Sequence, residues 1–198
     1  MRQNLKYVIA VIAIILFIFL GYELIHLVTR PAKSNKTTSV VAPVVKPLSD
    51  YAGTNAAVRV TIEGPVIASE QRRAIQITVS RDQRTIDVME GYRGLVLKTK
   101  SYDNDQAAYD IFLRALSGMG FTGNKKPLVS DGETLCAAGT HFYYELIDTG
   151  SDKEDFKYWS ISCGLKYGSA SGNGPAIRDL FSKQFPDYTD FVSDVHVQ

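Results

Sequence analysis

The sequence has few of the residues that build metal or disulfide scaffolds, with two cysteines and three histidines among 198 residues. Two cysteines form at most one bridge, which excludes a disulfide-dense miniprotein, and two thiolates alone do not make a structural zinc site. The chain also lacks a large net charge of either sign, because its 22 lysines and arginines nearly balance its 21 aspartates and glutamates. We therefore expect no basic nucleic-acid-binding module and no nucleic acid as a partner.

Motifs of common enzymes are missing as well. The glycine-rich stretch 164–174 contains neither G-x-x-x-x-G-K-[ST] nor G-x-G-x-x-G, and its serines do not form G-x-S-x-G. His141 is the one candidate base well inside the expected folded part, because His196 lies close to the C-terminus. The acidic turn 148–155 lacks the spacing of an EF-hand calcium loop. We predict no catalytic residue, no metal site and no cofactor.

The apolar residues are concentrated in one run, from Tyr7 to Val28. A helix of this length rises about 33 Å, enough to cross the hydrocarbon core of a bilayer. Arg30 follows where a signal peptidase requires a small residue, so cleavage is not expected. We predict a short tail (1–6) and an uncleaved transmembrane signal anchor (7–28) that places the protein in the cell membrane.

The orientation of the chain in the membrane rests on two opposing signals. Basic residues on both sides of the span, with more after it, favour a cytosolic C-terminus. The layout of a short tail, one span and one large domain favours an extracytoplasmic domain, and a cysteine pair suits an oxidising compartment. We expect the extracytoplasmic orientation, with a cytosol-facing membrane adaptor as the alternative. Residues 29–55, rich in Pro, Ser, Thr and Lys, read as a flexible linker, and residues 56–198 as the globular domain.

Hydrophobic periodicity predicts an α+β fold in which a two-layer antiparallel sheet packs against helices. Alternation with period two continues through residues 56–98 and predicts a four-stranded meander with one polar face, including Leu95 and Leu97 as half-buried positions. A helical stripe then follows, capped by Asp103 with Gln106. Its apolar members are Ala107, Ala108, Ile111, Phe112, Ala115, Leu116 and Met119. A last helix begins at Pro175.

A second hairpin is expected around the acidic turn. Alternation assigns Phe142, Tyr144, Leu146, Trp159 and Ile161 to the core face. It assigns His141, Tyr143, Glu145, Tyr158 and Ser160 to a solvated polar face. This pairing brings Cys163 near residue 140 and hence near Cys136, so we expect a disulfide bond, with two buried free thiols as the alternative.

Exposed tyrosines and the glycine-rich stretch are the candidate binding elements. Tyrosine offers contact area at low entropic cost, and a loop that leads into a helix start can contact a ligand. The candidate binding residues are Tyr143, Tyr158, Tyr167, Ser169, Ser171 and Asn173. These residue types favour a protein or glycan partner in the envelope.

The segments AAYDIFLRALSGMGFTG, YYEL, WSISCG and IRDLFSKQFPDY, with the Cys136 loop between them, resemble uncharacterised single-pass, cysteine-pair extracytoplasmic proteins of ultrasmall host-associated bacteria. The resemblance covers residues 90 to 190. It implies the combination of anchor, linker and cysteine-bearing domain, and no activity. We expect a non-enzymatic, membrane-anchored binding domain of the cell envelope. An envelope-associated hydrolase with a site at the glycine-rich stretch is the alternative.

Overall fold

The computed structural model describes residues 46–197, apart from 130–134, 150–152 and 165. The membrane span expected at 7–28 and most of the linker lie outside the described residues. Among the residues that are described, no helix is both long enough and apolar enough to cross a membrane.

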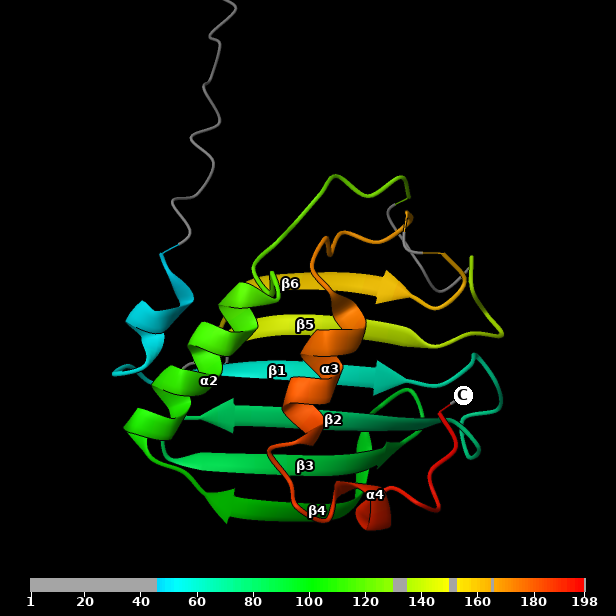
Figure 1. Ribbon diagram of the computed structural model, residues 1–198. Helices are drawn as coiled ribbons and strands as arrows, with labels where there is room; N and C mark the ends of the chain where they lie inside the picture. The colour runs from blue at the N-terminus through cyan, green and yellow to red at the C-terminus, as the bar shows by residue number, and fades with distance from the viewer. Residues whose placement is uncertain (1–45, 130–134, 150–152, 165, 198) are drawn as a thin grey trace, which may run out of the picture. The chain divides into compact units, whose positions relative to one another are not determined.

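A six-stranded antiparallel sheet forms one layer of the domain, with strand order β4-β3-β2-β1-β5-β6 (Figure 1). The strands are β1 (Ala56–Glu63), β2 (Arg73–Ser80), β3 (Gln83–Glu90), β4 (Leu95–Asp103), β5 (His141–Asp148) and β6 (Lys153–Ile161). The expected meander and the expected second hairpin are both present. They join into a single sheet because β1 pairs with β2 on one side and with β5 on the other.

Helices form the second layer, on one face of the sheet (Figure 1). They are η1 (Leu48–Tyr51), α2 (Gln106–Gly118), α3 (Gly174–Ser182) and α4 (Tyr188–Phe191). The core lies between the layers, where Phe112 of α2, Phe121 and Phe181 of α3 meet in edge-on and tilted ring contacts. The α+β fold class expected from the sequence is therefore confirmed.

The buried stripe of α2 differs from the expected one. Tyr109 and Leu113 are fully buried, whereas Ile111 is 69% exposed. The Tyr109 hydroxyl donates to the backbone oxygen of Ala56 at 3.0 Å. The buried stripe is Tyr109, Phe112, Leu113 and Leu116, whereas Ala107 and Ala108 are exposed. The N-cap also differs. It is Asp105, which accepts from the Ala108 N–H at 2.8 Å, because Asp103 is still part of β4.

The structure differs from two further expectations, one for the last strand of the meander and one for the linker. Leu95 and Leu97 are exposed rather than half-buried, because β4 is an edge strand and its register shifts against β3 between Val88 and Met89. The core also reaches into the segment assigned to the linker, since Leu48 is only 2% exposed.

The side chains of β6 face opposite to expectation. The register between β5 and β6 shifts by one residue, since Leu146 pairs with Phe156 and Ile147 with Glu154, which leaves Asp155 as the extra residue. Beyond it, Tyr158 and Ser160 face the helices and Trp159 and Ile161 face away from them. One extra residue moves every following side chain to the other face, which explains why alternation alone assigned Tyr158, Trp159 and Ser160 to the wrong faces. Ile161 is buried as expected, although on the face away from the helices.

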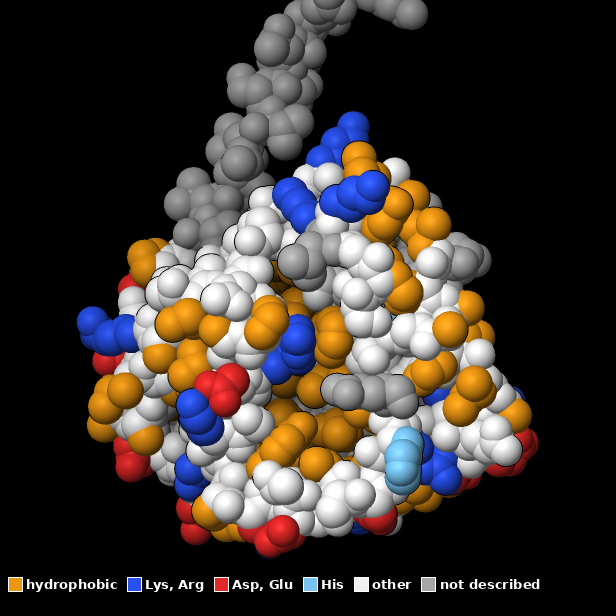
Figure 2. All heavy atoms as spheres, turned by 45° about the vertical axis from the view of Figure 1, so that its right-hand side comes forward, with side chains coloured by type: hydrophobic (Ala, Val, Ile, Leu, Met, Phe, Trp, Pro, Cys, Tyr) orange, Lys and Arg blue, Asp and Glu red, His pale blue; other side chains and the backbone are white. Residues whose placement is uncertain are grey.

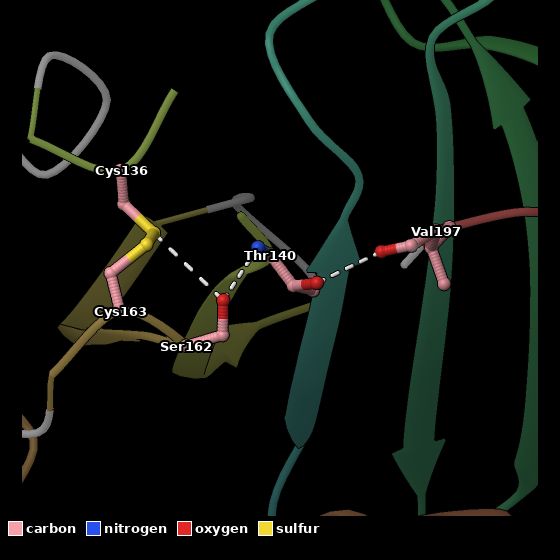
Figure 3. The surroundings of a disulfide bond; sticks show 5 residues. All are labelled: Cys136, Thr140, Ser162, Cys163 and Val197. Carbon is pink, nitrogen blue, oxygen red and sulfur yellow. Dashed lines mark hydrogen bonds between the residues drawn. A yellow bond between two sulfur atoms is a disulfide. The ribbon is translucent and has the colours of Figure 1, made fainter. Parts of the chain in front are cut away.

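The predicted disulfide between Cys136 and Cys163 is present, with the two Cα atoms 5.8 Å apart. It joins the loop before β5 to the end of β6 (Figure 3). Beside it, the Ser162 hydroxyl accepts from the Thr140 N–H at 2.9 Å, and the Thr140 hydroxyl donates to the Val197 oxygen at 2.9 Å. The bridge is therefore connected to the C-terminal segment through two side chains.

Candidate functional site: the polar sheet face

The face of the sheet opposite the helices carries two straight rows of polar and aromatic side chains, which we call the polar face. Strand pairing aligns the first row as Thr99, Asp87, Gln76, Thr61, Tyr143 and Trp159. The second row is Ser101, Thr85, Thr78, Arg59, Glu145 and Lys157. Each row takes one residue from each of the six strands, and neither contains an aliphatic side chain.

Hydrogen bonds hold the first row in place. The Thr99 hydroxyl donates to the Asp87 carboxylate at 2.6 Å, and the Gln76 amide nitrogen donates to the Thr61 hydroxyl at 3.2 Å. Such cross-strand pairs are the ordinary unit of side-chain order on a sheet. The two hydrogen bonds fix the orientation of the Gln76 amide and the Asp87 carboxylate. Neither bond uses the Gln76 amide oxygen or the second Asp87 carboxylate oxygen.

An ion pair orders the second row. The Lys157 ammonium lies 2.8 Å from the Glu145 carboxylate, and the Arg59 guanidinium donates to the Thr78 hydroxyl at 3.2 Å. Burial lowers the pKa of Lys157, but its hydrogen bond to Glu145 and the charges of Glu145 and Glu154 outweigh this and raise the pKa overall. Lys157 is therefore positively charged at neutral pH and neutralises Glu145.

Two residues of β5 that were expected on a solvated face are buried. Glu145 is 4% exposed and His141 is 2% exposed. Glu145 lies between the long side chains of Arg59 and Lys157, its neighbours across the two flanking strands. His141 lies at the start of β5, paired with Glu63 and Ile161. The prediction of a fully solvated face was wrong at both positions, and at Glu145 the reason is that the long side chains of its two neighbours cover it.

The aromatic end of the first row is formed by Tyr143 and Trp159, which are paired across β5 and β6. Both are partly exposed. The Lys157 ammonium lies 5.1 Å from the centre of the Tyr143 ring, a cation–π distance. Sequence alternation placed Trp159 in the core, so this pair was missed, and the register shift that explains it appears only in the strand pairing.

The glycine-rich stretch runs along the outer edge of β6. The Ser169 hydroxyl accepts from the Trp159 N–H at 3.0 Å, and the Ala170 N–H donates to the Trp159 oxygen at 3.0 Å. A side chain at Gly168 would approach the Trp159 backbone oxygen within 2.2 Å, so only glycine allows this close approach. The Ser169 hydroxyl thus fixes the backbone of Trp159, and Tyr167 lies next to this contact along the chain.

The remaining candidate residues lie on the helix side. Tyr158 accepts from the Asn124 amide at 3.0 Å, and Asn173 caps α3 by accepting from the Ala176 N–H at 3.2 Å. Ser171 lines a small cavity of about 100 Å³, together with Tyr144 and Ser160. The predicted binding residues therefore divide between two faces. Tyr143 belongs to the polar face, while Tyr158, Ser171 and Asn173 do not.

The helix side also has a shallow hollow with hydrophobic side chains at its floor (Figure 2). A groove of about 240 Å³ there is lined by Phe142, Arg178 and Tyr188, among others. The Arg178 guanidinium lies 3.8 Å from the centre of the Phe142 ring and donates to the Tyr144 hydroxyl at 2.9 Å. These polar atoms are therefore already engaged within the protein.

The described residues contain no group of three or more His, Cys, Asp and Glu side chains placed to hold a metal ion. Comparison of the chain with protein-family models, with curated proteins and with solved structures finds no significant match.

Proposed function

We propose that this protein is a membrane-anchored, extracytoplasmic binding domain of the cell envelope, without enzymatic activity, that binds its partner on the polar face. The observation that carries the proposal is the geometry of that face. Two rows of polar side chains cross all six strands on the side away from the helices, and the first ends in Tyr143 and Trp159. A rigid sheet with ordered side chains and partly exposed aromatic rings is suited to recognition.

The side chains around this face support binding rather than hydrolysis. A serine hydrolase requires a hydroxyl that is hydrogen-bonded to a general base. The Ser169 hydroxyl instead accepts from the Trp159 backbone, and His141 is buried at the start of β5. Glu145, the buried carboxylate of the face, is engaged in an ion pair with Lys157 at 2.8 Å.

The disulfide supports an extracytoplasmic location for the domain. Structural disulfides persist in oxidising compartments and are rare in the bacterial or eukaryotic cytosol. The bond between Cys136 and Cys163 joins the β5–β6 hairpin that bears Tyr143 and Trp159. It therefore belongs to the part of the domain that forms the binding face.

Orientation and partner capture test the proposal together, using the full-length chain in cells. An alkaline phosphatase fused to the C-terminus should be active, because the enzyme folds only outside the cytosol. In-cell crosslinking followed by purification should capture an envelope component. Tyr143→Ala and Trp159→Ala should lower this capture, while Tyr158→Ala, an aromatic truncation on the helix side, should leave it unchanged.

The opposite results would count against the proposal. An inactive phosphatase fusion would place the domain in the cytosol and favour the adaptor alternative. Capture that is lost with Tyr158→Ala and retained with Trp159→Ala would move the binding site to the helix side. Ile111→Ala, at an exposed position on α2, controls for nonspecific effects of substitution.

A further inference from the structure

We infer that the ligand of the polar face is an uncharged, extended glycan that lies across the strands along the first row. This inference rests on the proposed function and specifies its ligand class. It is based on the first row, in which strand pairing aligns one side chain from each strand, from Trp159 on β6 to Thr99 on β4.

The charges of the polar face balance, which favours a neutral ligand. Its two rows contain two basic residues, Arg59 and Lys157, and two acidic residues, Asp87 and Glu145. Lys157 is paired with Glu145 at 2.8 Å. An anionic polymer is attracted by a net positive surface, and this face has none.

The side-chain chemistry of the first row fits a sugar chain. A pyranose ring presents C–H groups on its faces and hydroxyls at its edge, so it needs aromatic rings to stack on and donors and acceptors beside them. Trp159 and Tyr143 supply the rings, whose faces carry negative partial charge. Gln76, Asp87 and Thr99 supply an amide, a carboxylate and a hydroxyl in line with them.

The same chemistry does not suit a protein partner. Protein interfaces are organised around a desolvated core of aromatic and aliphatic anchors from which charged residues are depleted. The two rows of the polar face contain no aliphatic side chain, and the isoleucines that flank them on β5 and β6, Ile147 and Ile161, are buried. The aromatic pair lies at one end of its row rather than at the centre. Hydroxyl, amide and carboxylate groups across most of the face would lose their water without an apolar centre to offset that cost.

The dimensions of the row favour an extended ligand. Neighbouring strands lie about 4.8 Å apart, so a row across six strands spans about 24 Å. Each step between strands is similar to the length that one sugar unit adds to a linear chain. The row lies on a sheet face rather than in a pocket, so it can accept an internal segment of a long glycan.

The polar groups of the row are oriented before a ligand arrives. The Gln76 amide nitrogen is held by Thr61 at 3.2 Å, and the Asp87 carboxylate is held by Thr99 at 2.6 Å. The amide oxygen and the second carboxylate oxygen are therefore placed as acceptors for sugar hydroxyls. Orientation before binding lowers the entropy lost on association.

Tryptophan fluorescence provides a direct test, because the chain contains one tryptophan. Full-length protein in detergent would be titrated with neutral linear oligosaccharides of glucose, mannose and N-acetylglucosamine, from disaccharides to hexasaccharides. At least one series should change the Trp159 emission, with affinity that increases with chain length and is insensitive to salt. Gln76→Ala and Asp87→Ala should each weaken binding about tenfold, which corresponds to about 1.4 kcal/mol.

Calorimetry would extend the test to Trp159→Ala, which should abolish binding, with Tyr158→Ala and Ile111→Ala as controls that should bind like the unmodified protein. Equal loss in the controls, or no binding of any neutral oligosaccharide, would overturn the glycan inference. If crosslinking then captures a protein in a Trp159-dependent manner, the binding proposal survives with a different ligand. If crosslinking captures nothing, both fail.

Discussion

Individual tyrosines in this domain have different environments that composition does not distinguish. Tyr109 is fully buried, and its hydroxyl donates to the Ala56 oxygen at 3.0 Å. Burial raises the pKa of the Tyr109 phenol well above its usual range, because a phenolate would lose its hydration in the core. Burial likewise raises the pKa of Tyr188. Tyr143 instead lies on the polar face beside a lysine. Tyrosine therefore occupies both buried positions and partly exposed positions on the polar face.

Alkaline pH should destabilise the domain through Tyr109. Below the ordinary tyrosine pKa of about 10, Tyr109 keeps its phenol proton in both the folded and the unfolded protein, so the domain has its full stability. Above it, the unfolded state releases the proton while the folded state retains it, so the free energy of unfolding falls by about 1.4 kcal/mol per pH unit for each such group. Urea unfolding between pH 8 and about pH 11 measures this slope.

Tyr109→Phe is the matched variant for this measurement. It should lower the free energy of unfolding at neutral pH by about 1 kcal/mol, because the hydrogen bond to Ala56 is lost. It should also reduce the alkaline slope. An unchanged slope would show that Tyr109 does not control the alkaline transition.

At the scale of elements, the irregular β5–β6 pairing decides which side chains the polar face presents. Asp155 is the extra residue between the Ile147–Glu154 and Leu146–Phe156 pairs. On the C-terminal side of Asp155, Phe156 lies toward the helices, where the centres of its ring and the Phe121 ring are 5.7 Å apart. With the same register, Trp159 pairs with Tyr143 and lies on the polar face.

Two deletions in β6 should therefore have opposite consequences. Deleting Asp155 removes the extra residue while keeping the pairs on either side, so the fold and the orientation of Trp159 should be retained. Deleting Lys157 should turn Phe156 outward and Asp155 toward the core. The free energy of unfolding should then fall by at least about 2 kcal/mol. Thermal unfolding compares the two, and equal losses would show that the extra residue does not set the register.

At the scale of the whole molecule, the disulfide and the C-terminus connect parts of the chain that are distant in sequence. The Cys136–Cys163 bond spans 27 residues, and Thr140 next to it binds the Val197 oxygen. Lys98 of β4 pairs with Asp194 at 2.5 Å, and Lys100 pairs with Asp187. The last residues are therefore attached both to the edge strand β4 and to the start of β5.

Removing the disulfide should destabilise the domain considerably. The variant with Cys136→Ser and Cys163→Ser should lose about 3 to 4 kcal/mol of unfolding free energy, because the unfolded chain regains the entropy of an open loop. Denaturant unfolding of the oxidised, reduced and double-serine proteins measures the difference. Ser162→Ala, which keeps the bridge and removes only its neighbouring hydroxyl, should lose less. A double-serine protein as stable as the oxidised one would contradict this expectation.

The sequence predicted much of the fold because local patterns report local structure. Alternation in β1 to β3 indicated strands whose inward residues are indeed buried, as with Val58 and Ile77. Asp105 caps the start of α2, and Gly120 with a positive φ follows the C-cap residue Met119, although the sequence prediction chose Asp103 as the N-cap. Edge position and register shifts do not appear in such patterns, so Leu95 and Trp159 were assigned to the wrong environments.

The amino-acid sequence by itself determined the α+β class, the strand-rich domain and the cysteine pair, because periodicity and residue spacing depend on neighbours along the chain. Tertiary structure decided that β1 joins two hairpins into one sheet and that an extra residue at Asp155 reverses β6. It thereby aligned Trp159 and Tyr143 with Gln76 and Asp87. Alignment across strands arises from long-range backbone pairing, which no local pattern specifies.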